Sequence, residues 1–507
     1  MPTRLRPLMH TGSPWSLQGF GILNTDGTTG GKTVRIMVVG SGGREHAIVR
    51  KLHRDAVRRG DVESLQMYAT PGNPGIAELA ICIPLEADNL IGLYALAVEL
   101  HIDLTIVGPE VPLSRGIVDV FEAKGLRIFG PTMSAARLES SKAFAKLEMQ
   151  KAGVPSPHYN TFRDLHSVMA HLQKHDGPIV VKADGLAAGK GVTVASSRQE
   201  AEQAVRQIML AKTFGDAGDT VILEQYLRGI EMSCMAFIDR SGYALMPPIK
   251  DHKSIFDKDE GPNTGGMGTV TPVHAANATV MKAVHERIFG NITDYFRRHK
   301  IVYRGVLFAG VIVLNQMAYV IEFNARFGDP ETQLALELMD NDLLEVIDAV
   351  LEDRVASLDL RWSRDAAVCV VLAAHGYPGT VRRGDVIEGL AEVQAMEHPR
   401  PLPEPIVLPV APAPPDPVGW RKWLGAKPDV AEPLEPERAR YSPLIAYPLH
   451  AGTALREDGK LITNGGRVIN IVGRGPTVAA ARAAAYEAVA RVKFSGKQFR
   501  TDIGERD

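Results

Sequence analysis

The sequence VVKADGLAAGKGV, residues 180–192, contains two apolar runs joined by a glycine-rich loop. The first run ends near Lys182, and the loop carries Lys190. A Walker phosphate loop has four residues between its first glycine and its Gly-Lys pair, and Ser or Thr and a helix follow. Here three residues separate Gly185 from Gly189, and a glycine and β-branched residues follow the lysine. The stretch therefore predicts a flap between two strands that closes over a nucleotide, with its lysines as charges for phosphate. This favours an ATP-consuming ligase over an NTPase switch.

Strands alternate with helices before this flap. An apolar strand begins at Val34, a glycine turn and an amphipathic helix follow it, and further strands come at 104–107 and from Leu126. This order predicts a parallel α/β sheet over about residues 34–135.

The rest of the chain forms further units, because 507 residues are too many for one core. A smaller α/β unit surrounds the flap, longer strands and a helix-like run over residues 331–352 follow it, and a last region starts near Ala366. Fourteen of the 33 prolines lie between residues 399 and 448. That density predicts an extended surface insertion rather than a central strand or a long helix.

Bulk composition excludes several classes of protein. The net charge of −2 gives no reason to expect nucleic acid or an anionic membrane as a partner. The three cysteines are far apart in the sequence, which suits a reducing cytosol and no disulfide framework. No apolar run approaches the roughly 18 residues that span a bilayer. The first 33 residues lack the apolar core of a secretory signal, so we expect a disordered extension or a start codon set too early.

A second glycine-rich turn, GSGGREH at residues 40–46, lies between the first strand and its helix. Backbone N–H groups at such a turn, helped by the helix dipole, bind anions. The dinucleotide pattern G-x-G-x-x-G fails because Glu45 replaces its third glycine and puts a negative charge beside the expected pyrophosphate. The turn predicts a phosphate or sugar-phosphate site at Gly42, Gly43 and Arg44, although a purely structural turn explains it equally well.

Other polar residues stand at places where ligands bind. Glu110 follows Gly-Pro at the end of a predicted parallel strand, where open α/β sheets bind ligands. Lys182 ends an apolar run, where a buried lysine needs an anionic partner. For a lone lysine such as Lys142, a solvated position at the surface is the more frequent case. The strand 221–227 can offer backbone groups to an adenine edge, and Glu231 can accept from ribose hydroxyls. A simple edge strand is the alternative for that segment.

Two further segments carry the strongest chemical signals. In the loop GPNTGGMG, residues 261–268, four glycines in eight residues let the backbone approach a ligand closely. In IEFNARFGDPET, residues 321–332, alternation places Glu322, Asn324 and Arg326 on one face. A carboxylate beside an amide oxygen suits Mg²⁺ held with substrate phosphates, and the arginine suits a carboxylate or phosphate. An exposed polar strand face is the alternative. The apolar residues of this segment are predicted to pack in the core: Ile321, Phe323 and Phe327.

Taken together, these motifs closely resemble the phosphoribosylamine–glycine ligases, a family of ATP-grasp enzymes in purine biosynthesis. The matching segments run in family order from Gly40 to Val468: GSGGREHA, DLTIVGPEVPL, ADGLAAGKGV, FGDAGD, DHK, GPNTGGMG, IEFNARFGDPETQ, GYPG, GDVI and TNGGRV.

The resemblance implies a multidomain α/β and α+β protein. Its N-terminal parallel α/β sheet domain binds substrate, its central ATP-grasp pair has a mobile lid, and its C-terminal domain is mixed α/β. The implied limits are 1–33 for the extension, 34–136, 137–360 with the lid at about 158–228, and 361–507 with the proline-rich insertion at about 399–446.

The resemblance also implies the reaction. Glycine, ATP and 5-phosphoribosylamine give glycinamide ribonucleotide, ADP and phosphate through a glycyl phosphate, with ATP as co-substrate and Mg²⁺ or Mn²⁺ as metal. Positioning and charge neutralisation carry such catalysis, so no protein nucleophile is needed, and the flap shields the acyl phosphate from water. A cytoplasmic monomer that binds neither nucleic acid nor membrane is expected.

Site residues follow from the resemblance by position. The metal is expected on Glu322 and Asn324. Catalytic roles are expected for Arg326, Lys182 and Asp251. ATP is expected on Lys142, Lys182, Gly185, Gly189, Lys190, Gly191, Glu224, Leu227 and Glu231. The substrates are expected on Gly42, Gly43, Arg44, Glu45, Glu110, Asn263, Thr264, Gly265, Gly266 and Arg326.

This chain departs from the family pattern at the extension, at the insertion, at Lys250 and at Gly310. Lys250 stands where a polar uncharged residue is expected, and Gly310 where many ATP-grasp enzymes carry a second acidic metal ligand. Two alternatives stay open: a related ATP-grasp ligase for another acid or amine, and a nicotinamide-binding protein built on the 40–46 turn, against which Glu45 argues.

Overall fold

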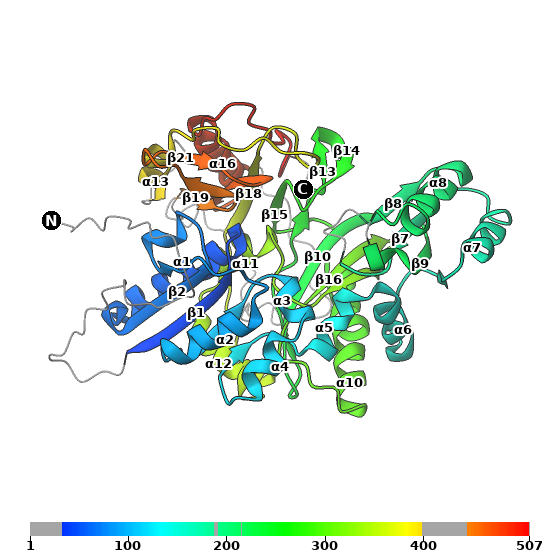
Figure 1. The fold of residues 1–507 in the computed structure, drawn as a ribbon, viewed down its shortest axis with the longest axis horizontal. Coiled ribbons are helices and arrows are strands. Elements are labelled where there is room, and N and C mark those ends of the chain that lie inside the picture. The colour runs from blue at the N-terminus through cyan, green and yellow to red at the C-terminus, as the bar shows by residue number, and fades with distance from the viewer. Residues whose placement is uncertain (1–32, 187–190, 214, 398–443, 506–507) are drawn as a thin grey trace, which may run out of the picture.

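The computed structural model describes residues 33–186, 191–213, 215–397 and 444–505. The predicted extension at 1–33 and the predicted insertion at 399–446 lie almost wholly outside these ranges, as do Gly189 and Lys190 of the predicted flap. In Figure 1 the N-terminal sheet lies at the left, the C-terminal region at the top, and the strands around the flap at the right.

The N-terminal region is a parallel sheet in the order β3-β2-β1-β4-β5, which confirms the predicted α/β sheet. Alternate residues of β1 enter different cores, with Met37 and Val39 in one and Ile36 and Val38 in the other, so an unbroken apolar run is buried on both faces. The strands are β1 (Val34–Gly40), β2 (Leu65–Pro71), β3 (Ile81–Cys82), β4 (Leu104–Val107) and β5 (Ile128–Phe129). The helices are α1 (Gly43–Arg59), α2 (Leu90–Glu99), α3 (Glu110–Ser114), α4 (Ile117–Glu122) and α5 (Met133–Ser140).

An antiparallel sheet in the order β11-β10-β16-β17 forms the middle of the molecule. Its strands are β10 (Ile230–Ile238), β11 (Tyr243–Leu245), β16 (Gly305–Leu314) and β17 (Met317–Asn324). Its apolar residues share a core with those of α6 (Lys142–Ala152), α9 (Ala278–Ala283), a π-helical segment (Val284–Gly290) and α10 (Asn291–Arg298).

The residues on either side of the flap form a separate small sheet in the order β6-β9-β7-β8. Its elements are β6 (Tyr159–Phe162), α7 (Leu165–Leu172), β7 (Ile179–Ala183), β8 (Val192–Ala195), α8 (Arg198–Met209) and β9 (Val221–Gln225). β7 and β8 are antiparallel neighbours, with Lys182 opposite Val192. The glycine-rich loop therefore joins two strands, as its spacing predicts.

A fourth sheet, in the order β12-β15-β18-β22-β19, lies in the upper part of Figure 1. It takes strands from both sides of the predicted domain limit at residue 360. Its strands are β12 (Lys250–Asp251), β15 (Gly268–Thr271), β18 (Ala366–Ala373), β19 (Ile445–His450) and β22 (Arg467–Gly475). Around it lie β13 (Ser254–Phe256), β14 (Glu260–Asn263), α13 (Leu390–Gln394), β20 (Thr453–Leu455), β21 (Leu461–Thr463) and α16 (Val478–Arg491).

The run predicted to be helix-like at 331–352 is helical, and it is divided into two helices, α11 (Glu331–Leu338) and α12 (Leu343–Leu351). Asp342 caps the second helix, because its side chain accepts hydrogen bonds from the backbone N–H groups of Leu344 and Glu345. No helix in the described ranges is both long enough and apolar enough to cross a membrane.

Candidate active site

The strand that carries the predicted metal ligands contains a β-bulge. In the pairing of β16 with β17, Gly310 lies opposite Glu322 and Val311 opposite Val320, which leaves Ile321 as the extra residue. Phe323 and Phe327 are buried as predicted. The prediction that Ile321 packs in the core is wrong, because the bulge turns it into a small pocket. That pocket is lined by Glu231, Met232, Ser233, Asp251, Lys253, Gly310, Val311 and Ile321.

Glu322 stands among cations. Burial raises the pKa of Glu322, but Lys253, Lys182 and then Lys142 outweigh burial and lower it to about 2. The Lys253 Nζ lies 3.7 Å from its Oε1. The carboxylate is therefore ionised at neutral pH, as a metal ligand must be.

The donor set at the end of β17 fits a hard divalent cation. Glu322 offers a carboxylate, and the Oδ1 of Asn324 accepts a long hydrogen bond of 3.4 Å from Arg326. Within the described ranges, no group of three or more His, Cys, Asp or Glu residues is placed to hold a metal ion. Two oxygen donors suit Mg²⁺, which usually completes its shell with water and substrate phosphates.

Lys182 has the anionic partner that its position requires. Its Nζ donates to Glu224 Oε1 at 2.9 Å and to the carbonyl of Ile321 at 3.0 Å. The other oxygen of Glu224 lies 2.6 Å from the Nζ of Lys146. Lys146 was not predicted as a site residue, although it follows Lys142 by one helical turn. Glu224 is thus buried between two lysines, where it fixes Lys182 beside the metal-ligand strand.

The predicted ATP residues come from four elements. Lys142 begins α6, and its Nζ donates to the carbonyl of Gly185 at 2.7 Å. The carbonyl of Gly191 accepts from the N–H of Ala183 at 2.8 Å, which closes the base of the loop. Leu227 lies in the link between β9 and β10, and Glu231 at the start of β10 lies 3.4 Å from Lys253. Gly189 and Lys190 lie outside the described residues.

Arg326 lies just beyond β17 and pairs with two carboxylates. Its Nε is 3.3 Å from Glu110, and its terminal nitrogen is 3.0 Å from Glu139. Glu139 also accepts from the N–H of Ala325 at 2.8 Å. Glu139 lies three residues before Lys142 but received no role from the sequence. The pair holds Arg326 between the N-terminal region and the metal-ligand strand.

The 40–46 turn uses its polar side chains within the protein. Glu45 accepts from the N–H of Gly42 at 2.6 Å and from Arg44 Nε at 2.6 Å, so it caps α1. Gly43 packs against Asn470, because a Cβ there would lie 1.8 Å from the Asn470 amide nitrogen. The structure therefore explains Glu45 and Gly43 by capping and packing. The capping carboxylate also occupies the helix start that a dinucleotide would need.

The loop at residues 263–266 is held from three sides. Thr264 is buried, and both its N–H and its hydroxyl donate to the carbonyl of Lys253 at 2.8 Å. Gly265 donates to the Tyr377 hydroxyl at 3.0 Å and accepts from Arg467 at 2.6 Å. Tyr377 and Arg467 lie in the GYPG and TNGGRV segments, so the motifs indicated them but gave no role.

The third predicted catalytic residue, Asp251, is a carboxylate in an unusual setting. Its Oδ1 is buried with no hydrogen-bond partner among the described residues. Burial first and the charge of Glu331 second raise the pKa of Asp251 well above its ordinary value, although Lys253 opposes them. Gly266 is required beside it, since its φ is +108° and a Cβ would lie 2.7 Å from Oδ1. A buried carboxyl whose pKa is raised in this way is a candidate for proton transfer.

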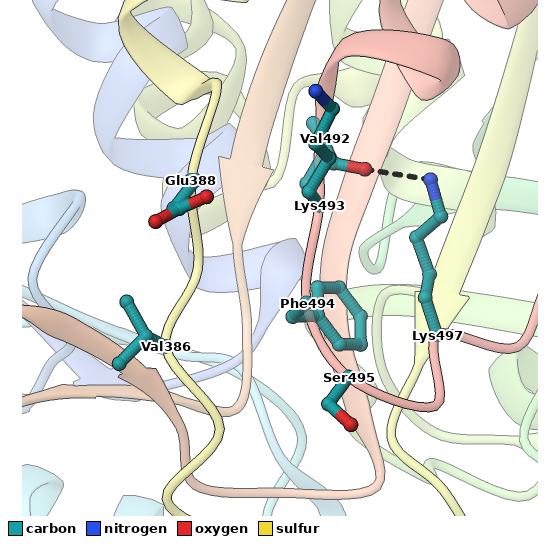
Figure 2. A pocket seen from close by; sticks show the side chains of 7 residues that line it. All are labelled: Val386, Glu388, Val492, Lys493, Phe494, Ser495 and Lys497. Carbon is teal, nitrogen blue, oxygen red and sulfur yellow. Dashed lines mark hydrogen bonds between the residues drawn. The ribbon is translucent and has the colours of Figure 1, made fainter.

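Figure 2 shows a second hollow, in the C-terminal region, that contains none of the predicted site residues. There Lys497 donates to the carbonyl of Val492 at 2.6 Å and so caps the end of α16. Three of the predicted residues, Lys142, Lys182 and Arg326, instead act on the carboxylate of Glu322. Lys253, which received no role from the sequence, acts on the same carboxylate.

Comparison with known proteins identifies the family of the chain. Family models described as phosphoribosylglycinamide synthetase match the chain in three parts: the N domain at residues 34–139, the ATP-grasp (A) domain at 140–332 and the C domain at 437–506. The phosphoribosylamine–glycine ligase of Caldanaerobacter subterraneus subsp. tengcongensis is 38% identical over 93% of this chain and 99% of that protein.

Solved structures give the same result. The crystal structure of phosphoribosylamine–glycine ligase from Thermotoga maritima has a TM-score of 0.70 and 29% identity, over 92% of this chain and 100% of that one. The biotin carboxylase domain of Hydrogenobacter thermophilus 2-oxoglutarate carboxylase, in complex with MgADP and bicarbonate, shares the fold at 15% identity and a TM-score of 0.62, over 92% and 91% of the two chains. This chain is a member of the phosphoribosylglycinamide synthetase family, the phosphoribosylamine–glycine ligases.

Proposed function

We propose that this protein joins glycine to 5-phosphoribosylamine and consumes ATP, giving glycinamide ribonucleotide, ADP and phosphate. Membership of the ligase family supports the reaction. The observation that carries it is the set of four cations around Glu322. A carboxylate that keeps its charge among them is suited to a site where phosphate groups and a metal meet.

Glu322 and Asn324 would hold the metal, Mg²⁺ or Mn²⁺. When bound, the metal neutralises charge on the phosphates of ATP. Lys142 and Lys182 would contact those phosphates, since both lie within electrostatic reach of Glu322. The segment that joins β9 to β10, which contains Leu227, would bind the adenine, and Glu231 would bind the ribose.

The first chemical step forms glycyl phosphate. A carboxylate oxygen of glycine bonds to the γ-phosphorus as the bond to the β–γ bridging oxygen breaks, and ADP leaves with that electron pair. Arg326 would hold the glycine carboxylate or the transferring phosphoryl group. The second step bonds the amine nitrogen of phosphoribosylamine to the acyl carbon, and phosphate leaves. We assign Asp251 to accept the proton that the amine loses.

The direct test measures ADP release with glycine and freshly made phosphoribosylamine, each omitted in turn. Release that needs both substrates supports the proposal. Release with another acid or amine, or dependence on bicarbonate as in a carboxylase, would point to a different ATP-grasp ligase. Tight NADH binding without ATP binding would overturn the ligase altogether, although the cap formed by Glu45 already opposes that alternative.

Replacing Asp251 by Asn is expected to lower kcat about 100-fold, because the amide cannot accept the amine proton. The KM for ATP should change little, since the phosphate-binding lysines stay in place. Steady-state ADP release against pH provides the measurement, and the limb of the wild-type profile that reports this carboxyl should vanish in the variant. Unchanged kcat and an unchanged profile would remove Asp251 from the mechanism.

We also propose that the protein acts as a monomer in the cytoplasm, on small molecules alone. The net charge of −2 supports the absence of a nucleic-acid partner. The domain limits given from the sequence, 34–136, 137–360 and 361–507, are proposed with it.

A further inference from the structure

A small hairpin carries two parts of the active site, and its residue Ile255 is buried in a small cluster with Met267 and Ala373. Within the part of the chain that the structure describes, β13 and β14 pair only with each other, and their register is irregular between Ser254 and Phe256. An isolated two-stranded hairpin is marginally stable in water. Its turn contains Lys258 and Asp259, both with φ of 60°, a conformation that is unfavourable for residues other than glycine. The hairpin therefore needs an external support.

The last residues of the chain supply that support. Asp502 accepts from the N–H of Lys258 at 2.7 Å, in the middle of the unfavourable turn. Arg500 donates to Asp259 at 2.7 Å and to the carbonyl of Ser254 at 3.3 Å. It also forms two bonds of 2.7 Å to Asp502. The side chain of Arg500 is only 1% exposed, and that of Asp502 is 18% exposed, so the bonds between these two residues are largely shielded from water, whereas Asp259 is 68% exposed.

The C-terminal segment is itself fixed to α16. Tyr486 donates to the carbonyl of Arg500 at 2.8 Å and accepts from the N–H of Ile503 at 3.1 Å. Arg482 donates to the carbonyl of Thr501 at 2.7 Å. The segment can therefore transmit the rigidity of a helix to the hairpin.

Both ends of the hairpin reach the site. Lys253 immediately precedes β13 and lies 3.4 Å from Glu231 and 3.7 Å from Glu322. Thr264 immediately follows β14 and is bonded to the carbonyl of Lys253. A shift of the hairpin would move the Lys253 ammonium together with the loop at residues 263–266, the proposed substrate loop.

We propose that Asp502 and Arg500 are positioning residues, which hold the β13–β14 hairpin and thereby place Lys253 and the 263–266 loop for the substrates. The inference rests on the proposed function for its kinetic consequence. Its physical consequence, that the C-terminal segment keeps the hairpin ordered, does not depend on the proposed function.

The test compares Asp502→Ala with a matched control, Asp458→Ala. Asp458 likewise accepts from a backbone N–H, that of Lys460, and from an arginine, Arg456, next to a hairpin turn between β20 and β21. That hairpin carries none of the proposed site residues. Arg500→Lys is the conservative variant and should retain part of the support.

Two measurements are needed on the full chain. Hydrogen exchange should become faster at residues 254–264 in Asp502→Ala and stay unchanged there in the control. Steady-state kinetics should show kcat/KM for phosphoribosylamine reduced roughly tenfold, with the KM for ATP within about twofold of wild type. Arg500→Lys should lie between Asp502→Ala and wild type in both measurements.

Unchanged exchange in the hairpin of Asp502→Ala would overturn the proposal. Faster exchange in the hairpin with unchanged steady-state kinetics would also overturn it. So would an equal loss of kcat/KM for ATP and for phosphoribosylamine together with faster exchange throughout the chain, because that result indicates a general structural role. If wild-type protein released no ADP with glycine and phosphoribosylamine, the proposed function would fail. The exchange measurement would still decide whether the C-terminal segment holds the hairpin.

Discussion

Replacing Glu322 by Ala is expected to abolish measurable ADP release and to leave the fold largely intact. The variant loses the charged member of the proposed two-donor metal site and leaves Lys142, Lys182 and Lys253 without their shared carboxylate. A metal that bridges transferring phosphates stabilises the transition state by several kcal/mol, so we expect kcat to fall by roughly 1,000-fold or more.

Metal binding separates this cause from general damage. Binding of Mn²⁺ in the presence of ADP, followed by electron paramagnetic resonance, should be lost in Glu322→Ala. It should persist in Glu352→Ala, a control that removes an exposed carboxylate paired with Arg354. Normal turnover by Glu322→Ala would show that the metal assignment is wrong. Lost turnover with undiminished Mn²⁺ binding would move the metal ligand elsewhere.

Much of the fold follows from local pattern. The parallel N-terminal sheet and the loop between β7 and β8 were predictable, since apolar runs and glycine spacing report on neighbours close in sequence. The side-by-side placement of Glu322 and Asn324 follows from strand alternation. Alternation gives the wrong side of the strand for Ile321, because the β-bulge depends on the pairing with β16. The sequence near Ile321 contains no signal that predicts this bulge.

The roles of glycines and charges were harder to predict. Gly43 fits the pattern of an anion site, but its small size is needed for the contact with Asn470, more than 400 residues later. Glu45 departs from the dinucleotide pattern because it caps its own helix. Lys182 needed an anion, yet the sequence could not name Glu224 as that anion. Such pairings are set by tertiary packing, which a single sequence does not display.

The C-terminal part contributes more to the site than its motifs suggested. Arg467 reaches across to the carbonyls of Gly265 and Asp329 at 2.6 Å each. β12 and β15 join the C-terminal sheet although they precede it by about 100 residues. Because these contacts cross the predicted domain limit, the loop at residues 263–266, which is proposed to bind substrate, is held in place by residues from two regions of the sequence.

A buried carboxylate far from the chemistry holds three regions together, and its removal is expected to have the largest effect on stability. Glu337 at the end of α11 is 1% exposed and contacts Arg50 at 3.1 Å, Arg54 at 2.7 Å, Arg474 at 3.2 Å and the hydroxyl of Tyr447 at 2.9 Å. These partners come from α1, β22 and β19, so one side chain joins the N-terminal sheet domain to the C-terminal sheet.

The pKa of this carboxyl gives the size and the sign of the effect. Burial raises the pKa of Glu337, but Arg54, Arg50 and Arg474 outweigh burial and lower it from 4.5 to about 2. A pKa that is lower in the folded state stabilises the protein above the unfolded value, and the stabilisation is lost as the pH falls from about 4.5 towards 2. A shift of this size means that the Glu337 carboxyl contributes on the order of 3 kcal/mol to the free energy of unfolding at pH 7.

Glu337→Gln should therefore lower the free energy of unfolding by about 3 kcal/mol at pH 7, because three arginines lose the charge that balances them. The difference between wild type and variant should shrink as the pH falls below about 4.5, since the wild-type carboxyl then takes up a proton as well. Urea unfolding between pH 7 and pH 3 measures both. Glu345→Gln, an exposed change on the neighbouring helix α12, should cost less than about 0.5 kcal/mol at either pH. A difference that stayed constant with pH would mean that the carboxyl acts through shape and packing, and that its charge does not hold the regions together.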